Sequence, residues 1–286
     1  MGALTAVVSR LPRSWISFIG RLQWKHPLLK HLFNRLAERF RNQDQTIQRG
    51  AGKGLRFNTG TTNAGYILGT TEPDTQKALE LLVKPGMTIY DVGANVGFLT
   101  IIAARLIGPE GCVVCFEPQS ENVRRLQHNA SLNGFGQIMI RREALGAIDG
   151  EAEFCFSSEP GWGKLAKFGA PGQEVRREQV AIRRLDSVTP DLRPPQLIKI
   201  DVEGAETDVL KGGAETLRTH RPLLLIELHK TNESVADLLL EMKYRCHALG
   251  STSDVRTLPW DTKLLAIPIE RDDLASAVQV IMRSTR

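Results

Sequence analysis

Cysteines and long apolar runs are both scarce in this chain of 286 residues. No stretch approaches the roughly 20 apolar residues that a membrane helix needs, and Arg10 and Arg13 interrupt the only candidate signal region. Of the four cysteines, Cys112 and Cys115 have the C-x-x-C spacing, but no second Cys or His pair stands at ligand spacing. We therefore expect buried, reduced thiols in a cytoplasmic protein rather than a metal or disulfide site.

The chain beyond residue 42 also lacks a basic excess. Residues 1–42 carry eight Lys or Arg and one acid, a net charge of +7, which leaves −2 for the remainder of the +5 total. A nucleic-acid-binding domain needs basic residues to neutralise phosphates, so we expect no nucleic-acid partner. Apolar residues at helical spacing over 13–42 predict basic amphipathic helices. Such helices pack on a domain or second subunit, or bind the inner membrane surface peripherally, and both alternatives stay open.

What the sequence does contain is a glycine turn at residues 88–97, Thr-Ile-Tyr-Asp-Val-Gly-Ala-Asn-Val-Gly. An apolar β-type run ends in Asp91, a turn carries Gly93, Asn95 and Gly97, and a helical pattern begins at Phe98. The order strand, glycine turn, helix is typical of the first unit of a nucleotide-binding α/β sheet. We therefore predict a nucleotide or nucleoside ligand at this turn.

The residue types in the turn bear on which ligand that is. A dinucleotide fingerprint needs glycine at its third position, where a pyrophosphate approaches the backbone, and Asn95 stands there. The Asp91 carboxylate would oppose a phosphate but attract a cation. S-adenosylmethionine carries an ammonium and a sulfonium and no phosphate, and it suits this turn better than NAD. Glu117, twenty residues after Gly97, is placed to accept ribose hydroxyls, which fits either ligand.

Beyond this turn, strand-like and helix-like patterns alternate, which predicts an α/β fold with a doubly wound, mainly parallel sheet and helices on both faces. We expect helices over 73–82, 98–106, 120–132 and 234–242 and another beginning near residue 206, with strands over 113–116, 137–142, 152–156, 179–184, 197–202, 223–228, 246–249 and 264–269.

A cluster of charged residues follows two of these strands. Alternation along a strand would place Lys199, Asp201 and Glu203 on one face, and Glu227 and His229 share a face at the end of the next. Unpaired charges on a buried central strand are costly, so a wet pocket at the strand ends is expected. Either His229 or the acids would act as general base. Two alternatives stay open: a structural ion-pair cluster, and a site for Mg²⁺ or another divalent ion.

Five motifs in order resemble the FkbM family of S-adenosylmethionine-dependent methyltransferases, over roughly residues 66–270. They are residues 91–100, 116–118, 185–188, 198–206 and 223–229. The resemblance implies a class I methyltransferase (Rossmann-like) fold, with a seven-stranded sheet whose last strand is antiparallel. It also implies methylation of a hydroxyl on a sugar or secondary metabolite. We assign residues 51–286 to the methyltransferase domain and residues 1–50 to a basic helical N-terminal extension.

The family pattern also implies roles for individual residues. The methionine end of the cofactor would lie near Asp91, Gly93, Asn95 and Gly97, and Glu117 would hold the ribose. The adenine would lie near Glu143 and Ala144, and Glu72 would also reach the cofactor. The acceptor, a small molecule or a glycan, would enter over Asp201, Glu203 and His229, with Lys199 beside them. Trp162, in a Gly-rich stretch, is a candidate to stack on a sugar.

We therefore expect an S-adenosylmethionine-dependent O-methyltransferase in which an acceptor hydroxyl attacks the methyl group in line and a base takes the proton. Two other classes remain. One is an NAD(P)-binding oxidoreductase, and the other is a membrane-surface-associated protein that binds the cofactor without turnover. Nucleic-acid base methylation is disfavoured, because such enzymes often carry an Asn/Asp-Pro-Pro-aromatic segment where this chain has Asp201-Val-Glu-Gly.

Overall fold

The computed structural model describes residues 42–60, 65–157, 163–165 and 174–283, in two compact units, 1–71 and 72–286. The first unit contains an antiparallel pair, β1 (Gln45–Thr46) and β2 (Arg56–Phe57), and the short helix α4 (Gly65–Leu68). The helices predicted over 13–42 fall almost entirely outside the described residues, and so does Trp162, so both stay predictions. No helix in the described ranges is long and apolar enough to cross a membrane.

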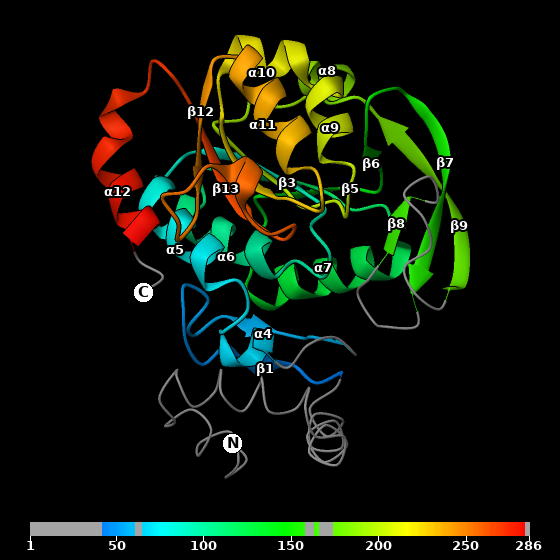
Figure 1. Ribbon diagram of the computed structural model, residues 1–286. Coiled ribbons are helices and arrows are strands. Elements are labelled where there is room, and N and C mark those ends of the chain that lie inside the picture. Colours follow the sequence, from blue (N-terminus) through cyan, green and yellow to red (C-terminus); the bar gives the residue numbers. More distant parts are fainter. Residues whose placement is uncertain (1–41, 61–64, 158–162, 166–173, 284–286) are drawn as a thin grey trace, which may run out of the picture. The chain divides into compact units, whose positions relative to one another are not determined.

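A seven-stranded sheet forms the centre of the second unit, in the order β12-β13-β11-β10-β3-β4-β5 (Figure 1). Neighbouring strands pair in parallel from β5 to β11, and β13 runs antiparallel to both of its neighbours. This confirms the predicted class I fold with its reversed last strand. The strands are β3 (Thr88–Val92), β4 (Cys112–Phe116), β5 (Ile138–Arg141), β10 (Leu197–Ile200), β11 (Leu223–Glu227), β12 (Tyr244–Ala248) and β13 (Lys263–Pro268).

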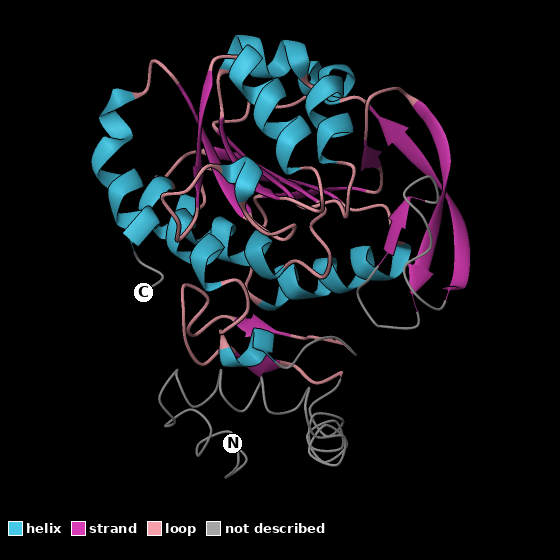
Figure 2. Ribbon diagram, in the orientation of Figure 1, coloured by secondary structure: helices cyan, strands magenta, loops and turns pink. Residues whose placement is uncertain are grey.

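Helices cover both faces of this sheet, as Figure 2 shows. One face carries α5 (Pro73–Leu82), α6 (Phe98–Ile107), α7 (Ser120–Leu132) and α12 (Ala275–Arg283), and the other carries α8 (Leu185–Val188), α9 (Glu206–Gly212), α10 (Ala214–His220) and α11 (Asn232–Glu241). Because both faces are covered, β10 and β11 consist of almost unbroken apolar runs that are buried along their length. The helix α12, which packs on α5, is absent from the sequence-based prediction.

The strands predicted near 152–156 and 179–184 belong to a separate four-stranded sheet, in the order β6-β9-β7-β8. It consists of β6 (Ala144–Leu145), β7 (Gly150–Ser157), β8 (Gly163–Leu165) and β9 (Glu174–Arg183). Strands β7 and β9 form a long antiparallel pair, and a small apolar cluster of Ala144, Val180 and Ile182 packs with Ala152 and Phe154. Alternating apolar and polar residues therefore mark a sheet with one packed face.

The strand register sets up the functional edge of the main sheet. Val92 pairs with Phe116 on one side and with Ile200 on the other, and Ile200 pairs with Ile226. The residues that follow, Gly93, Glu117, Asp201 and Glu227, therefore emerge at the same level at the carboxyl ends of four neighbouring strands. Ligands of open α/β sheets bind at this edge.

Candidate active site

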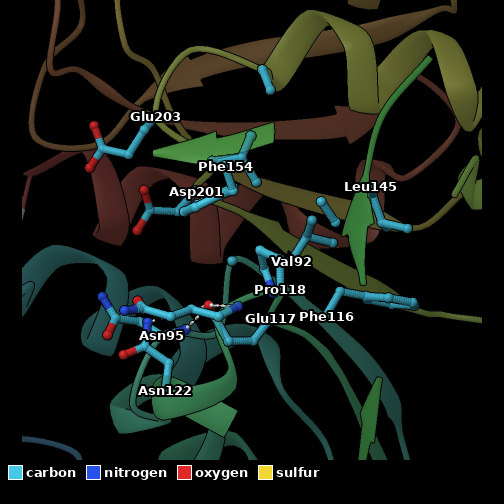
Figure 3. A pocket seen from close by; sticks show the side chains of 15 residues that line it. Val92, Asn95, Phe116, Glu117, Pro118, Asn122, Leu145, Phe154, Asp201 and Glu203 are labelled. Carbon is cyan, nitrogen blue, oxygen red and sulfur yellow. Dashed lines mark hydrogen bonds between the residues drawn. The ribbon is translucent and has the colours of Figure 1, made fainter. Parts of the chain in front are cut away.

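A pocket of about 670 Å³, partly open to solvent, lies at this edge (Figure 3). Six of the twelve predicted site residues line it: Gly93, Asn95, Glu117, Ala144, Asp201 and Glu203. Figure 3 shows Glu117 and Asn95 on one side and Asp201 and Glu203 on the other. Three of the lining side chains are acids and none is Lys, Arg or His. The pocket is therefore built for a ligand that carries positive charge.

Glu117 lies on the pocket wall, where its buried carboxylate is held by loop donors. Its Oε2 accepts the main-chain N–H of Asn95 at 2.8 Å, and its Oε1 accepts the N–H of Gln119 at 2.9 Å and the amide of Asn122 at 3.3 Å. Burial raises the pKa of Glu117, and these hydrogen bonds oppose the shift. Since the Asn95 N–H is already bonded, it is not free to cradle a pyrophosphate, and this argues against the NAD(P) alternative.

Close packing inside the protein, rather than contact with a ligand, is the first reason why Gly93 and Gly97 must be glycine. Gly93 has φ 75°, and a Cβ added to it would lie 1.8 Å from the main-chain oxygen of Asp201. Gly97 has φ 86° and precedes α6, and a Cβ there would lie 2.8 Å from Leu126 of α7. Gly97 does not line the pocket, in contrast to the role that the resemblance implies for it. Its backbone lets α6 and α7 approach each other.

Asp91 differs most from its predicted position. The prediction turned its carboxylate toward the ligand, but Asp91 does not line the pocket. Its Oδ2 accepts the Thr100 hydroxyl at 2.6 Å, and its Oδ1 lies 3.2 Å from Lys199 Nζ. Asp91 and Lys199 are register partners on adjacent strands, so their side chains meet beneath the turn. The carboxylate is therefore neutralised internally.

Lys199 is likewise not on the pocket wall, although it was predicted to be catalytic. Its Nζ donates to the main-chain oxygen of Gly93 at 2.9 Å and lies 3.5 Å from Asp201 Oδ2. Burial alone would lower the pKa of Lys199, but Asp91, Asp201 and Glu72 more than reverse this and raise it. Lys199 therefore stays positively charged and links the glycine turn, through the main-chain oxygen of Gly93, to the acids around it.

Glu203 reaches the pocket from a turn rather than from a strand. The prediction placed it on one strand face with Lys199 and Asp201, but β10 ends at Ile200 and Glu203 has a left-handed backbone with φ 53°. Burial raises the pKa of Glu203, and the neighbouring His229 opposes that shift. The turn brings its carboxylate beside Asp201, where both side chains line the same pocket.

His229 stands behind these two acids, and its ring is oriented by Glu206. Its Nδ1 lies 2.9 Å from Oε1 of the fully buried Glu206, while its Nε2 lies 3.6 Å from Glu203 and 3.9 Å from Asp201. Burial would lower the pKa of His229, but the bond to Glu206 and the nearby acids raise it to about 9. At neutral pH the ring therefore carries its proton, and it is not a free base.

Glu206, which orients His229, is not among the site residues named in the sequence analysis. It also accepts the Thr231 hydroxyl at 2.8 Å and the Gly204 N–H at 2.9 Å. It is also the first residue of α9, and a helix was expected to begin near residue 206. Its second role depends on His229, which is remote in sequence and comes close only because β10 and β11 are adjacent.

The divalent-ion alternative concerns the same side chains. Ligand atoms of Asp201, Glu203 and His229 all lie within 4.8 Å of one another. Glu206, Glu203 and Asp201 raise the pKa of His229, so a metal ion would have to displace the proton of the imidazole in order to bind it. Ion pairing between the imidazolium and the carboxylates also accounts for this geometry, so the divalent-ion site stays an untested alternative.

The remaining predicted residues, Glu72 and Glu143, stand outside the pocket wall. Glu72 lines a smaller neighbouring cavity, where Lys263 pairs with Glu227 and lies 3.5 Å from Glu72. Burial raises the pKa of Glu72, and Lys263 opposes the shift. Glu143 accepts the Arg141 guanidinium at 2.9 Å, and its neighbour Ala144 alone faces the pocket.

A seven-stranded sheet with a reversed last strand, and an acid-lined pocket at its central carboxyl ends, define a class I S-adenosylmethionine-dependent methyltransferase. The model of the methyltransferase FkbM domain matches residues 91–250, more than half of the chain. The protein therefore belongs to the FkbM methyltransferase family.

Two curated methyltransferases and one solved structure are similar to this chain. The chain is 26% identical over 206 residues to Methyltransferase 1 of Beauveria bassiana, covering 65% of this chain and 75% of that one. It is 29% identical over 163 residues to the 2-O-methyltransferase NoeI of Sinorhizobium fredii, covering 51% of this chain and 65% of that one. An FkbM methyltransferase structure from Methylobacillus flagellatus aligns at 20% identity with a TM-score of 0.45, over 63% of this chain and 43% of that one.

Proposed function

We propose that this protein transfers the methyl group of S-adenosylmethionine to a hydroxyl oxygen of a sugar or of a secondary metabolite. The observation that carries the proposal is the charge pattern of the pocket. One end presents the fixed carboxylate of Glu117, and the other presents Asp201 and Glu203 beside His229. The 2-O-methyltransferase activity in the name of NoeI points to the same chemistry.

The lining residues fit S-adenosylmethionine in three respects. Glu117 Oε2 retains acceptor capacity for a ribose hydroxyl after bonding Asn95 N–H. Ala144, Leu145 and other apolar side chains offer a surface for the adenine. Asp201 and Glu203 would face the positively charged end of the cofactor. When bound, S-adenosylmethionine supplies an electrophilic methyl group.

The chain's own contribution to the reaction would be alignment and proton transfer. A carboxylate of Asp201 or Glu203 accepts the proton of the acceptor hydroxyl, because His229 already holds its proton at neutral pH. Glu203 is the stronger candidate, since burial raises its pKa and makes it a better base. His229, fixed by Glu206, keeps the two carboxylates in place and charged.

The test is transfer of labelled methyl from S-adenosylmethionine by the full-length protein, with pooled saccharides and pooled hydroxylated metabolites as acceptors. We expect the label on oxygen, and we expect a loss of about 100-fold or more in rate for Glu203→Gln if that carboxylate is the base. Glu121→Gln, an exposed acid on α7, is the matched control. Label on nitrogen or carbon, or an unchanged rate when Asp201→Asn and Glu203→Gln are combined, would contradict the proposal.

A further inference from the structure

Beyond the acids, an exposed indole stands beside His229. Among the exposed large apolar side chains of the described residues, Trp260 is the one aromatic, with 53% of its surface accessible. Its ring centroid lies 6.3 Å from that of His229, and the two planes are inclined by 48°. His229 therefore contacts Trp260 and also lies close to Glu203, which lines the pocket.

The segment that carries this indole is fastened in place. The main-chain oxygen of Trp260 accepts the N–H of Lys230, and the amide of buried Asn232 donates to Pro259 at 3.2 Å. Leu228 N–H donates to Thr262 as well. The turn after β11, which carries His229, thus also holds the Trp260 segment. The main chain that carries the indole is therefore held beside His229.

This combination of groups fits one acceptor chemistry best. A sugar ring has an apolar face of C–H groups that stacks on an indole, while its hydroxyls bond to carboxylates and imidazolium groups. The groups next to Trp260 are of that polar kind: His229, and behind it Glu203 and Asp201. A flat apolar metabolite would offer these charged groups no hydrogen bond in place of the water that it displaces. A uronic acid would meet like charge at the same place.

We propose that Trp260 is the stacking platform of a subsite for a neutral saccharide acceptor, which presents a sugar hydroxyl to Glu203 and Asp201. The inference rests on the proposed O-methyl transfer and narrows its acceptor to one class. Trp162, the stacking residue predicted from the sequence, lies outside the described residues, whereas the position of Trp260 beside His229 is described.

The experiment compares methyl transfer to a panel of neutral hexose, N-acetylhexosamine and uronic acid oligosaccharides, and to hydroxylated aromatic compounds. The variants of the full-length protein are Trp260→Ala, Trp260→Phe and the control Leu240→Ala, which removes an exposed apolar side chain from α11. For Trp260→Ala we expect the KM for neutral saccharide to rise about tenfold. The kcat and the affinity for S-adenosylmethionine should stay close to the parent's, and Trp260→Phe should recover most of the loss.

Failure of this inference is separable from failure of the proposed function. If the parent methylates saccharides and Trp260→Ala has an unchanged KM, the platform is refuted and O-methyl transfer stands. If the parent methylates only aromatic hydroxyls, the saccharide subsite is refuted and O-methyl transfer again stands. If bound S-adenosylmethionine gives no O-methyl product with any acceptor class, both proposals fall. A loss of vesicle binding or self-association in Trp260→Ala, with its KM unchanged, would reassign the indole to an interface.

Discussion

Replacing Glu117 with alanine should weaken the binding of S-adenosylmethionine. The hydrogen bonds that Glu117 already accepts within the protein allow the size of this effect to be worked out. The two carboxylate oxygens offer about four acceptor positions, and the N–H groups of Asn95 and Gln119 and the amide of Asn122 take three. About one position remains for a ribose hydroxyl. A hydrogen bond to a charged acceptor is worth about 1.5–3 kcal/mol, so we expect the dissociation constant to rise about 10- to 150-fold.

Calorimetric titration of the full-length protein measures this change. S-adenosylhomocysteine has the same ribose, so Glu117→Ala should weaken both ligands by the same factor. Glu117→Gln should not rescue binding, because its amide group would point a donor at the N–H of Asn95 or Gln119. The control is Glu121→Ala, an exposed acid in the first turn of the following helix α7, which pairs with the partly buried Arg125.

Thermal unfolding must accompany the titration, since Glu117→Ala leaves two loop N–H groups without their acceptor. The titration is done well below the unfolding temperature of each variant. A weaker affinity then reports a lost contact and not a loss of folded protein. If Glu117→Ala is folded and binds both ligands within about threefold of the parent, Glu117 does not hold the ribose. A loss for one ligand and not the other would likewise contradict a ribose contact.

Two further predictions concern the turn and the histidine. Gly93→Ala should lower the free energy of unfolding by about 3 kcal/mol, because the added Cβ meets the Asp201 carbonyl oxygen and the backbone is left-handed. Gly86 has φ 82° and open space where a Cβ would be added, so Gly86→Ala should lower the free energy of unfolding by only about 1–2 kcal/mol. Equal losses for the two variants in urea unfolding would refute the clash at Gly93. The raised pKa of His229, about 9, stabilises the fold fully below its ordinary value of 6.5, and this stability is lost as pH rises through 9. The parent should therefore lose more stability than His229→Gln between pH 7 and 10, and identical pH profiles of stability for these two proteins would contradict this. NMR titration of the imidazole ring should also show that the pKa of His229 is lower in Glu206→Gln than in the parent.

The main sheet and its helices were predictable because local patterns and tertiary structure agree there. The helix predicted over 120–132 is α7 with the same bounds, and Pro73 begins α5 as expected of proline in a first turn. The separate sheet of β7 and β9 was not predictable, since alternation identifies a strand but not the sheet it joins. The helix α12 was missed because no helix or strand was assigned to the residues after the predicted strand over 264–269.

The site was predictable as a set of strand ends, but not as a set of contacts. Glu117, Asp201 and Glu203 line one pocket because residues that follow parallel strands meet at one edge. Which acids remain available depends on register, which the sequence does not reveal. Lys199 is paired across the sheet with Asp91, and so it removes that carboxylate from the ligand's surroundings. Glu206 was missed because its partner, His229, lies on the next strand's turn.

This pairing changes the reason why the turn suits a cationic cofactor. The sequence argument assigned the attraction to Asp91, but a carboxylate 3.2 Å from a buried lysine offers little net charge. The lining carboxylates are Glu117, Asp201 and Glu203, and protein donors fix Glu117 while His229 neighbours the other two. Acids at both ends of the pocket, with the Asn95 amide already engaged, disfavour a phosphate even though the turn resembles a dinucleotide cradle. The selectivity for a cationic, phosphate-free nucleoside would thus reside in the strand ends of β4 and β10 rather than in the glycine turn itself.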